Sequence, residues 1–355
     1  MDVHGLTNEY ESWLARHATL VPDALEKKHA LLAKGPFPFL RGTFHLWVRR
    51  WPEICPELAK APELLAVGDL HVENFGTWRD AEGRLVWGVN DFDEAHRCAY
   101  AQDLVRLATS ALLANEGGDL AIGDADACRA IRDGYAEALA AGGRPFVLDE
   151  KHRWLRDHVT GAARDPGAFW DKLRALPPLP GAPPADAIRG LEALLPEKGL
   201  AYECRARVAG VGSLGLVRVV ALAEWRGGPI AREAKARVPS ALAWAAGGDE
   251  ADRYGELLSR AVRAPDPLVR VVKGWLIRRL APDCARVELV DLPRARDEAR
   301  LLEAMGRETA NVHLGDRAAA RAVEADLRGR PRSLLHDAAR RMADAVIADA
   351  KEWRR

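Results

Sequence analysis

The sequence predicts an α+β protein, because helix-like and strand-like segments are mixed and the strands gather in two places. Apolar residues at helical spacing predict helices at 8–34, 99–115, 124–141, 150–176, 249–263 and from 294 to the end. Short runs rich in β-branched residues predict strands at 64–67, 75–79, 84–89, in three stretches within 204–235, at 275–280 and at 285–290.

Local signals mark where several of these elements end. The stretch Gly35-Pro36-Phe37-Pro38 ends the first helical segment. Asp124 or Asp126 is a suitable cap for the helix at 124–141, and Gly142-Gly143 follows its last turn. The stretch PPLPGAPPA at 177–185 is the best linker candidate in the chain.

Composition excludes several classes of protein. The 355 residues carry 52 basic and 52 acidic side chains, so a nucleic-acid binder that depends on counterion release is not expected. There is no apolar run of 18 residues and no signal-peptide core at the acidic, polar start, which predicts a cytoplasmic protein without a membrane span. Five scattered cysteines without a C-x-x-C motif predict reduced thiols that are mostly buried.

The first group of candidate site residues lies around a predicted hairpin. Asp69 precedes Asn74 by five positions, the spacing of a kinase catalytic loop in which the aspartate accepts a proton and the asparagine holds a metal. A turn at 80–83 pairs residue 79 with 84 and residue 74 with 89, which brings Asn74 close to Asp91 and Asp93. These oxygen donors suit Mg²⁺, which takes few protein ligands and completes its shell with phosphates and water.

A simpler interpretation makes Asp69 and Asp91 turn or cap residues, but three oxygen-bearing residues around one hairpin favour a metal site. His71 and Glu73 form a His-x-Glu pair that is typical of zinc deaminases, yet the P-C-x-x-C partner motif is missing. His71 is therefore either structural or close to the substrate, and Glu73 is expected to be solvated.

The second group is a G-x-G-x-x-G stretch that contains Gly210, Gly212, Ser213 and Gly215. In a dinucleotide-binding fold the last glycine would begin a helix. Here a β-branched, strand-like run follows, which favours a glycine loop between antiparallel strands whose N–H groups cover phosphates. Val217 fits the valine of the kinase pattern, and Lys235 on the next strand fits its phosphate-binding lysine rather than an ordinary surface lysine.

The order of the two groups is reversed relative to ordinary kinases, in which the glycine loop comes first. A circular permutation restores the usual order, with the cut just before the catalytic loop. Helix 249–263 then takes the place of the kinase glutamate helix, and strand 275–280 with Ala281-Pro282 takes the place of the hinge. The helix ending at His313 stands for the one that precedes the catalytic loop. Such a cut is tolerable because chain termini often lie close together at the surface.

Several motifs together resemble one bacterial family, catalogued as domain of unknown function 2252 and grouped with protein-kinase-like and aminoglycoside-phosphotransferase-like folds. They are GDLHVENFG (68–76), NDFDEA (90–95), DLVRLATS (103–110), GVGSLG (210–215) and the Lys235 strand. The resemblance implies a permuted kinase-like fold with a small β-rich nucleotide lobe and a larger helical lobe. The lobes are expected at 1–195 (catalytic loop and metal site), 196–283 (glycine loop and lysine) and 284–355 (helices returning to the catalytic lobe).

The resemblance also implies roles for single residues. Asp69 is the base, Asn74 and Asp91 are metal ligands, and Asp103 anchors the catalytic loop. Several positions depart from the pattern of the small-molecule kinases: Val67 stands in place of a histidine, Asp93 in place of the last residue of D-F-G, and Ala236-Arg237 in place of Glu-Ala. Glu256 is the best candidate for the partner of Lys235.

The leading hypothesis for function is ATP- and Mg²⁺-dependent phosphoryl transfer to the hydroxyl or amine of a small molecule. The helical insert at about 117–195 is expected to shape the acceptor pocket, and Arg41 either reaches a phosphate or forms an ordinary ion pair. Transfer of AMP by a reversed nucleotide and a non-catalytic nucleotide-binding role are the alternatives. No nucleic-acid or membrane partner is expected.

Overall fold

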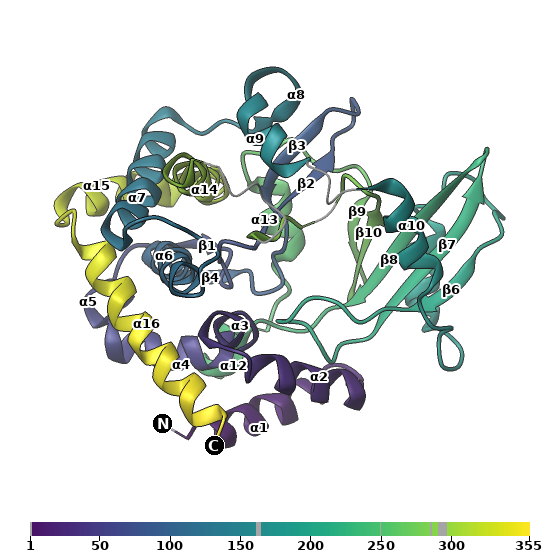
Figure 1. Cartoon of the computed structure of the whole chain (residues 1–355), viewed down its shortest axis with the longest axis horizontal. Coiled ribbons are helices and arrows are strands. Elements are labelled where there is room, and N and C mark those ends of the chain that lie inside the picture. The colour runs from purple at the N-terminus through teal and green to yellow at the C-terminus, as the bar shows by residue number, and fades with distance from the viewer. Residues whose placement is uncertain (1, 161–164, 249, 285, 290–296) are drawn as a thin grey trace.

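Two bodies of secondary structure lie side by side in the chain, a larger helical body and a five-stranded sheet (Figure 1). The computed structural model describes residues 2–160, 165–248, 250–284, 286–289 and 297–355. The predicted mixed α+β class is confirmed.

The helices occupy both ends of the chain and its middle. In chain order they are α1 (Val3–Leu14), α2 (Pro22–Leu32), α3 (Pro36–Gly42), α4 (Phe44–Ile54), α5 (Pro56–Ala59), α6 (Tyr100–Glu116), α7 (Asp124–Ala141), α8 (Leu148–Lys151), α9 (Arg153–Val159), α10 (Pro166–Arg174), α11 (Ala185–Glu192), α12 (Ala241–Ala246), α13 (Tyr254–Arg260), α14 (Glu298–His313), α15 (Arg317–Gly329) and α16 (Leu334–Trp353).

The described strands form three antiparallel sheets. They are β1 (Glu63–Ala66), β2 (Phe75–Arg79), β3 (Leu85–Val89), β4 (His96–Ala99), β5 (Phe146–Val147), β6 (Glu203–Ala206), β7 (Arg218–Trp225), β8 (Gly228–Ala236), β9 (Val269–Val272) and β10 (Trp275–Leu280). Strand β1 pairs with β4, the order β2-β3-β5 makes a second sheet, and the large sheet has the order β6-β7-β8-β10-β9.

The large sheet is covered on both faces by helices from the predicted insert. On one face Leu191 of α11 packs with Ala234 of β8 and Ile277 of β10. On the other face Leu173 of α10 packs with Val220 and the residues around it. Helices α10 and α11 therefore belong with the sheet, although the boundary expected at residue 195 assigned them to the helical lobe.

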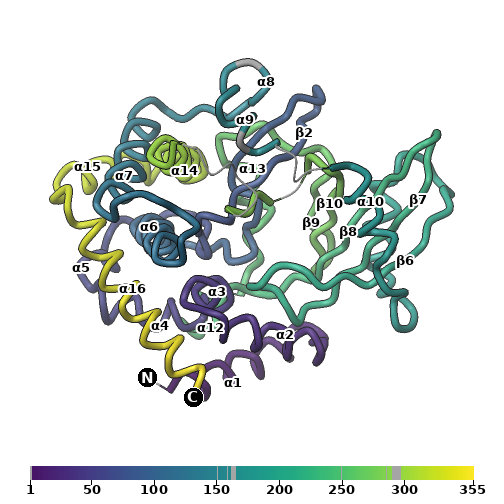
Figure 2. The backbone as a smooth tube through the Cα atoms, viewed as in Figure 1, coloured from purple at the N-terminus to yellow at the C-terminus, as the bar shows by residue number. Residues whose placement is uncertain are grey.

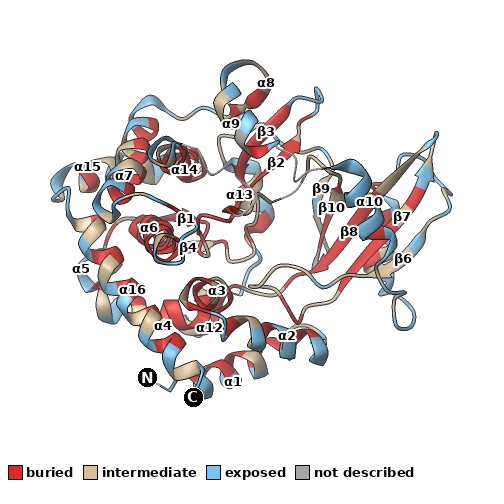
Figure 3. Ribbon diagram, viewed as in Figure 1, coloured by how far each residue is buried: buried red, intermediate tan, exposed pale blue. Residues whose placement is uncertain are grey.

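The helical body is built around α6, whose residues from Tyr100 to Ala114 are all buried (Figure 3). Apolar side chains make up most of this surface, and helices α7, α14 and α16 pack around it. Three of its buried polar residues, Asp103, Arg106 and Ser110, contact the segment between β1 and β2, as described below.

The two ends of the chain lie next to each other (Figure 2). The backbone N–H of Val3 donates to Glu352 Oε1 at 3.0 Å. The rings of His4 and Trp353 stack with their centroids 4.6 Å apart. Helix α1 is thereby fixed against the end of α16.

Several element predictions need correction. The segment 8–34, expected to form one or two helices, contains parts of two, α1 and α2. The prolines at 36–38 begin α3 as well as ending the segment before it, because proline suits the first turn of a helix. The helix predicted at 249–263 extends only over Tyr254–Arg260. The segment from 294 contains three helices, of which the first begins at Glu298; residues 294–296 lie outside the described part.

Two strand predictions are also wrong in detail. The hairpin pairs Arg79 with Leu85 and Phe75 with Val89, one residue away from the predicted register. The cause is Asp80, whose Oδ1 accepts the N–H groups of Glu82 and Arg84 and keeps Arg84 in the loop. Within 286–289 only an isolated bridge from Arg286 to Gly76 is present in place of a strand; residues 285 and 290 lie outside the described part.

The cysteine and membrane expectations have clear outcomes. All five thiols are free; Cys55, Cys98 and Cys128 are buried, and Cys204 and Cys284 are partly exposed. Among the described helices, none combines the length and apolar character that a membrane span requires.

Gly68, at the start of the segment that follows β1, provides a test of the fold. Its φ is +83°, and a Cβ built there would lie 2.4 Å from the carbonyl oxygen of Glu94. Gly83 in the hairpin turn is a matched control, since its φ is +75° but nothing lies within 4 Å of its Cβ position. We expect Gly68→Ala to lower the free energy of unfolding by at least about 2 kcal/mol, and Gly83→Ala by about 1 kcal/mol. Urea titration measures both, and equal losses would show that the close approach at Gly68 is unimportant.

Candidate functional site

The segment from Val67 to Asn74, called here the catalytic loop, is held by one face of helix α6. Asp103 accepts the N–H of Val67 at 2.7 Å and that of Gly68 at 2.9 Å. Ser110, seven residues further along α6, accepts the N–H of Val72 at 2.9 Å. Both side chains are completely buried, so the loop backbone is tied to the buried core of the helical body.

Helix α14 supports this arrangement from below, as the permuted order predicts. His313 at its end donates from Nε2 to Asp103 at 2.9 Å. The other ring nitrogen of His313 bonds the Tyr135 hydroxyl at 2.9 Å. The expected anchoring contact of Asp103 and the expected position of the helix ending at His313 are confirmed.

Asp69 forms an ion pair with Arg106 that was not predicted from the sequence. Its Oδ1 accepts from Nε of Arg106 at 2.8 Å, and the second contact of that guanidinium to Oδ1 is still closer. Arg106 is completely buried, stacks over Phe44 and Trp47, and donates to the carbonyl of Leu40 at 2.8 Å. Desolvation raises the pKa of Asp69, and Arg106 works against that rise.

The signal for Arg106 was present in the sequence. Asp103, Arg106 and Ser110 lie three and four residues apart in the motif DLVRLATS, so they share one face of the helix. An arginine inside an otherwise apolar helix needs a buried acceptor, because an unpaired charge is costly in the interior.

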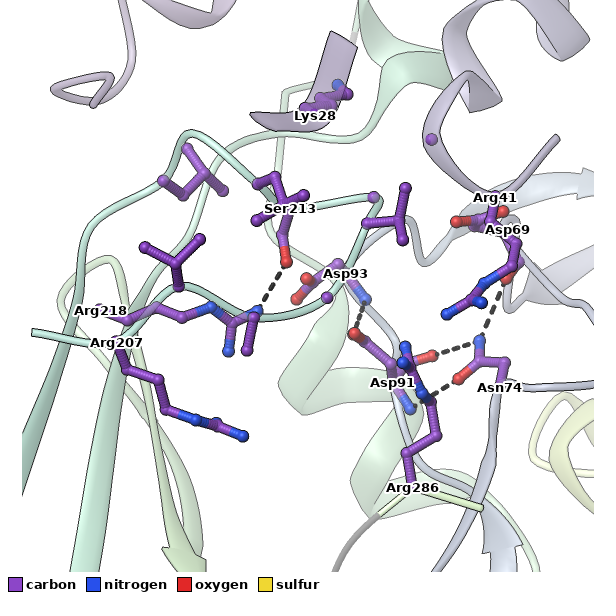
Figure 4. A pocket seen from close by; sticks show the side chains of 18 of the residues that line it. Lys28, Arg41, Asp69, Asn74, Asp91, Asp93, Arg207, Ser213, Arg218 and Arg286 are labelled. Atoms are coloured by element: carbon purple, nitrogen blue, oxygen red, sulfur yellow. Dashed lines mark hydrogen bonds between the residues drawn. The ribbon is translucent and has the colours of Figure 1, made fainter. Parts of the chain in front are cut away.

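Asn74 and Asp91 meet across the end of the hairpin (Figure 4). The side-chain amide of Asn74 donates to the carbonyls of Asp69 at 3.1 Å and Asp91 at 3.0 Å. Its Oδ1 accepts the N–H of Asp91 at 3.0 Å. Asn74 therefore fixes the distance between the catalytic loop and the turn at 91–93.

Lys235 of β8 lies against this turn although it is 144 residues away from Asp91 in the chain. Its Nζ is 3.3 Å from Oδ2 of Asp91 and in closer contact with Asp93. Desolvation lowers the pKa of Lys235 to about 8, with Asp91 opposing the change. The predicted partner Glu256 is wrong, because Glu256 pairs with Arg253 and Arg260 on its own helix.

Two departures from the kinase pattern meet in one ion pair. Asp93 and Arg237 each replace a different residue type of the family pattern, and Arg237 contacts Asp93 as well as Asp252. Lys235 is on β8 and Arg237 directly follows the end of this strand, and both cations reach the turn at 91–93. The second aspartate and the extra arginine therefore compensate each other.

The glycine loop spans residues 207–217 between β6 and β7 and begins no helix, as predicted for a phosphate-covering loop. Its backbone approaches the catalytic loop, since a Cβ at Gly212 would lie 3.4 Å from Oδ2 of Asp69. Gly215 has a φ of +102°, and its carbonyl accepts the N–H of Val21 at 2.8 Å. Val217 packs with the cluster on the α11 face of the sheet and is not part of the cleft lining.

Arg41, His71 and Glu73 form a polar edge of the same site. Arg41 makes a close ion pair with Glu73, which is buried and also accepts the N–H of Leu289 at 3.0 Å; the expectation of a solvated Glu73 is wrong. Burial lowers the pKa of His71 well below its ordinary value, and its Nδ1 accepts the N–H of Glu73 at 3.2 Å. His71 is a neutral residue that lines the cleft.

Many of these residues line one cleft of about 510 Å³ between the helical body and the sheet; Lys235, which contacts Asp91 and Asp93, is not itself part of the lining. Asp69, Asn74 and Asp91 line one side and the glycine loop lines the other. Helix α10 of the insert contributes Lys172 and Leu173. The cleft is rich in cations; its lining includes Lys28, Arg41, Lys172, Arg207, Arg218, Arg237, Arg278 and Arg286.

The donor set fits a hard divalent cation that is shared with a ligand. Within the described residues, no three His, Cys, Asp or Glu side chains gather into a complete metal site. The cleft offers the carboxylates of Asp91 and Asp93 and the amide oxygen of Asn74. Magnesium is commonly held by one or two carboxylates, with substrate phosphates and water as its other ligands.

Comparison with known proteins adds one match. Neither the curated proteins nor the solved structures contain a match to this chain. The matched segment, residues 20–163, contains the catalytic loop, the turn at 91–93 and helix α6, and ends before the glycine loop. Over these residues the chain is similar to a bacterial family described as "Uncharacterized protein conserved in bacteria (DUF2252)".

Proposed function

We propose that the chain is a circularly permuted, kinase-like phosphotransferase that uses MgATP and acts on a hydroxyl or amine of a small molecule. The observation that carries this proposal is the meeting of two distant groups of residues. Lys235 contacts Asp91 and Asp93, and Gly212 lies against Asp69, over separations of more than a hundred residues. In a kinase, the phosphates that the glycine loop and the lysine hold are the same phosphates whose oxygens bind the metal. The glycine loop with Lys235 and the catalytic loop with Asp91 can therefore act only together.

The order of strands gives independent support to the permuted fold. Lys235 lies on the central strand β8, flanked by Arg218 of β7 and Leu276 of β10. This places strand 275–280 next to the lysine strand, as the permuted order predicts. The start of α1 lies next to the end of α16. Joining the two chain ends at this point would restore the usual order of kinase elements.

Asp69 is suited to accept the proton of the acceptor. Arg106 occupies Oδ1 and fixes the carboxylate, while Oδ2 faces the backbone of the glycine loop at Gly212. In the proposed reaction the acceptor oxygen or nitrogen forms a bond to the γ-phosphorus, the bond from that phosphorus to the leaving oxygen of ADP breaks, and the acceptor proton moves to Asp69. Bound magnesium would supply charge neutralisation at the phosphates, held by Asp91 with Asn74 and Asp93.

The alternatives use much of the same site. AMP transfer by a reversed nucleotide needs the same metal ligands, and the mass added to the acceptor distinguishes it from phosphate transfer. A purely structural or sensing role predicts nucleotide binding without turnover.

Nucleotide binding is the first prediction of this proposal. MgATP at about 100 times its Kd should raise the melting temperature of the wild-type protein by on the order of 5 °C, because a ligand that binds only the folded state stabilises it. Lys235→Met and Asp91→Asn should each lose most of that shift, measured against the melting temperature of the same variant without ligand. Lys273→Met, an exposed lysine in the turn before β10, is the control and should keep the shift. Absence of a shift in the wild-type protein at millimolar MgATP would contradict the proposal.

Turnover is the second prediction. Asp69→Asn removes the proton acceptor but keeps an oxygen that can accept from Arg106, so the shift with MgATP should remain. Turnover of ATP with an acceptor pool of small metabolites should fall by roughly 10²- to 10⁴-fold. Turnover within about threefold of the wild-type rate would exclude Asp69 as the base.

A further inference from the structure

A second cationic cluster lies on the cleft face of the large sheet, centred on Glu233. Glu233 precedes Lys235 by two residues on β8 and is completely buried. Arg218 of β7 donates to its Oε2 at 3.0 Å, and Arg278 of β10 donates to the same oxygen at 2.7 Å. Arg207, in the first part of the glycine loop, donates to its Oε1. We refer to Arg207, Arg218, Arg278 and Glu233 as the roof cluster.

The roof cluster carries more positive charge than it needs for its own structure. One carboxylate faces three guanidinium groups, which leaves an excess of two positive charges. All three arginines line the cleft, whereas Glu233 lies behind them (Figure 4 shows Arg207 and Arg218). Asp91, the next carboxylate toward the catalytic loop, is already paired with Lys235.

One buried donor of the cluster is unused, and two of its arginines are partly exposed. Arg218 is almost fully buried and bonds Ser213 of the glycine loop at 2.7 Å through one nitrogen, yet its buried Nε has no hydrogen-bond partner within the described part of the chain. Arg207 and Arg278 are each about one-quarter exposed, toward the cleft.

Burying like charges together is costly unless an anion joins them. Burial lowers the pKa of Arg218, and Arg278 and Arg207 add to that effect against the opposing charge of Glu233. Glu233 responds in the opposite sense: burial would raise its pKa, but Arg278, Arg207 and Arg218 together hold it well below its ordinary value. Glu233 is therefore ionised and shared by three arginines. Among the described residues, the only further carboxylate that the structure shows acting on this cluster is Asp91, which, against the effect of burial, raises the pKa of Arg278 together with Glu233 and which Lys235 also contacts.

We propose that the roof cluster binds a phosphate group of the ligand that occupies the cleft. A phosphate carries up to two negative charges, which match the excess, and its oxygens accept the forked hydrogen bonds that guanidinium groups donate. The proposal rests on the proposed function for the identity of the ligand as phosphate-bearing. The phosphate comes either from the nucleotide itself or from a phosphorylated acceptor.

The test removes two of the three arginines and keeps the ion pair between Arg218 and Glu233. The double variant Arg207→Gln/Arg278→Gln leaves Arg218 to neutralise Glu233 one to one, so the sheet is expected to fold. Arg205→Gln is the matched control, because Arg205 lies on the neighbouring strand β6 with the same exposed fraction as Arg207 and is not part of the cleft lining. Isothermal titration with metal-free inorganic tripolyphosphate reports binding without any activity.

We expect the wild-type protein and Arg205→Gln to bind tripolyphosphate equally, and the double variant to bind it at least about tenfold more weakly. Binding by the double variant within about twofold of wild type, or no binding by wild type, would overturn the proposal. If MgATP binding weakens in parallel with tripolyphosphate binding, the phosphate belongs to the nucleotide; if it does not, the phosphate belongs to a separate ligand.

Failure of this proposal is distinguishable from failure of the proposed function. In one outcome the wild-type protein binds MgATP, Lys235→Met loses this binding, and the double variant binds both MgATP and tripolyphosphate as wild type does. This outcome supports the phosphotransferase proposal and excludes the roof cluster as a phosphate site. Wild-type protein that binds tripolyphosphate through the roof cluster but shows no response to MgATP keeps the cluster as a phosphate site and excludes the phosphotransferase.

Discussion

The contact of Lys235 with Asp91 and Asp93 is the interaction on which the arrangement of the two bodies depends. Lys235 is 1% exposed in the centre of the large sheet, where an unpaired ammonium group would cost several kcal/mol. It is neutralised by two carboxylates that follow the hairpin of the helical body. The turn at 91–93 must therefore lie directly against β8, and the catalytic loop, which Asn74 ties to this turn, comes with it. The glycine loop leads into β7, the strand next to β8, and therefore lies close to the catalytic loop at Asp69.

Charge compensation explains the rest of the cleft. Asp93 and Arg237 pair with each other, Arg106 balances Asp69, and Arg41 balances Glu73, so most charged groups in the site have a partner already in place. The roof cluster is different because three arginines share one carboxylate. The carboxylates of the cleft are consequently held in ion pairs, and the arginines of the roof cluster are in excess over their one carboxylate. A phosphate-bearing ligand requires such positive charge.

Features encoded by neighbouring residues could be predicted from the sequence, and features created by distant ion pairs could not. The strand at 275–280 and the absence of a helix after the glycine loop follow from local patterns, whereas the contact of Asp103 with the catalytic loop was implied by the family resemblance. Arg106, the pairing of Glu73 with Arg41 and the roof cluster were missed, because a charged residue in the sequence does not indicate which distant residue neutralises it. The prediction of Glu256 as the partner of Lys235 failed for the same reason, since it relied on the order of elements and the nearer carboxylates of Asp91 and Asp93 took that place. The roles of Asp69, Lys235 and the metal ligands, together with the glycine loop and Arg41, remain predictions.

The most direct measurement is a crystal structure of the protein with Mg²⁺ and a non-hydrolysable ATP analogue. The proposed function predicts the triphosphate between the glycine loop and the turn at 91–93, with the metal bound by Asp91 and Lys235 in contact with a phosphate oxygen. An analogue bound outside this cleft, or a cleft in which Lys235 keeps both carboxylates while no metal binds Asp91, would contradict it.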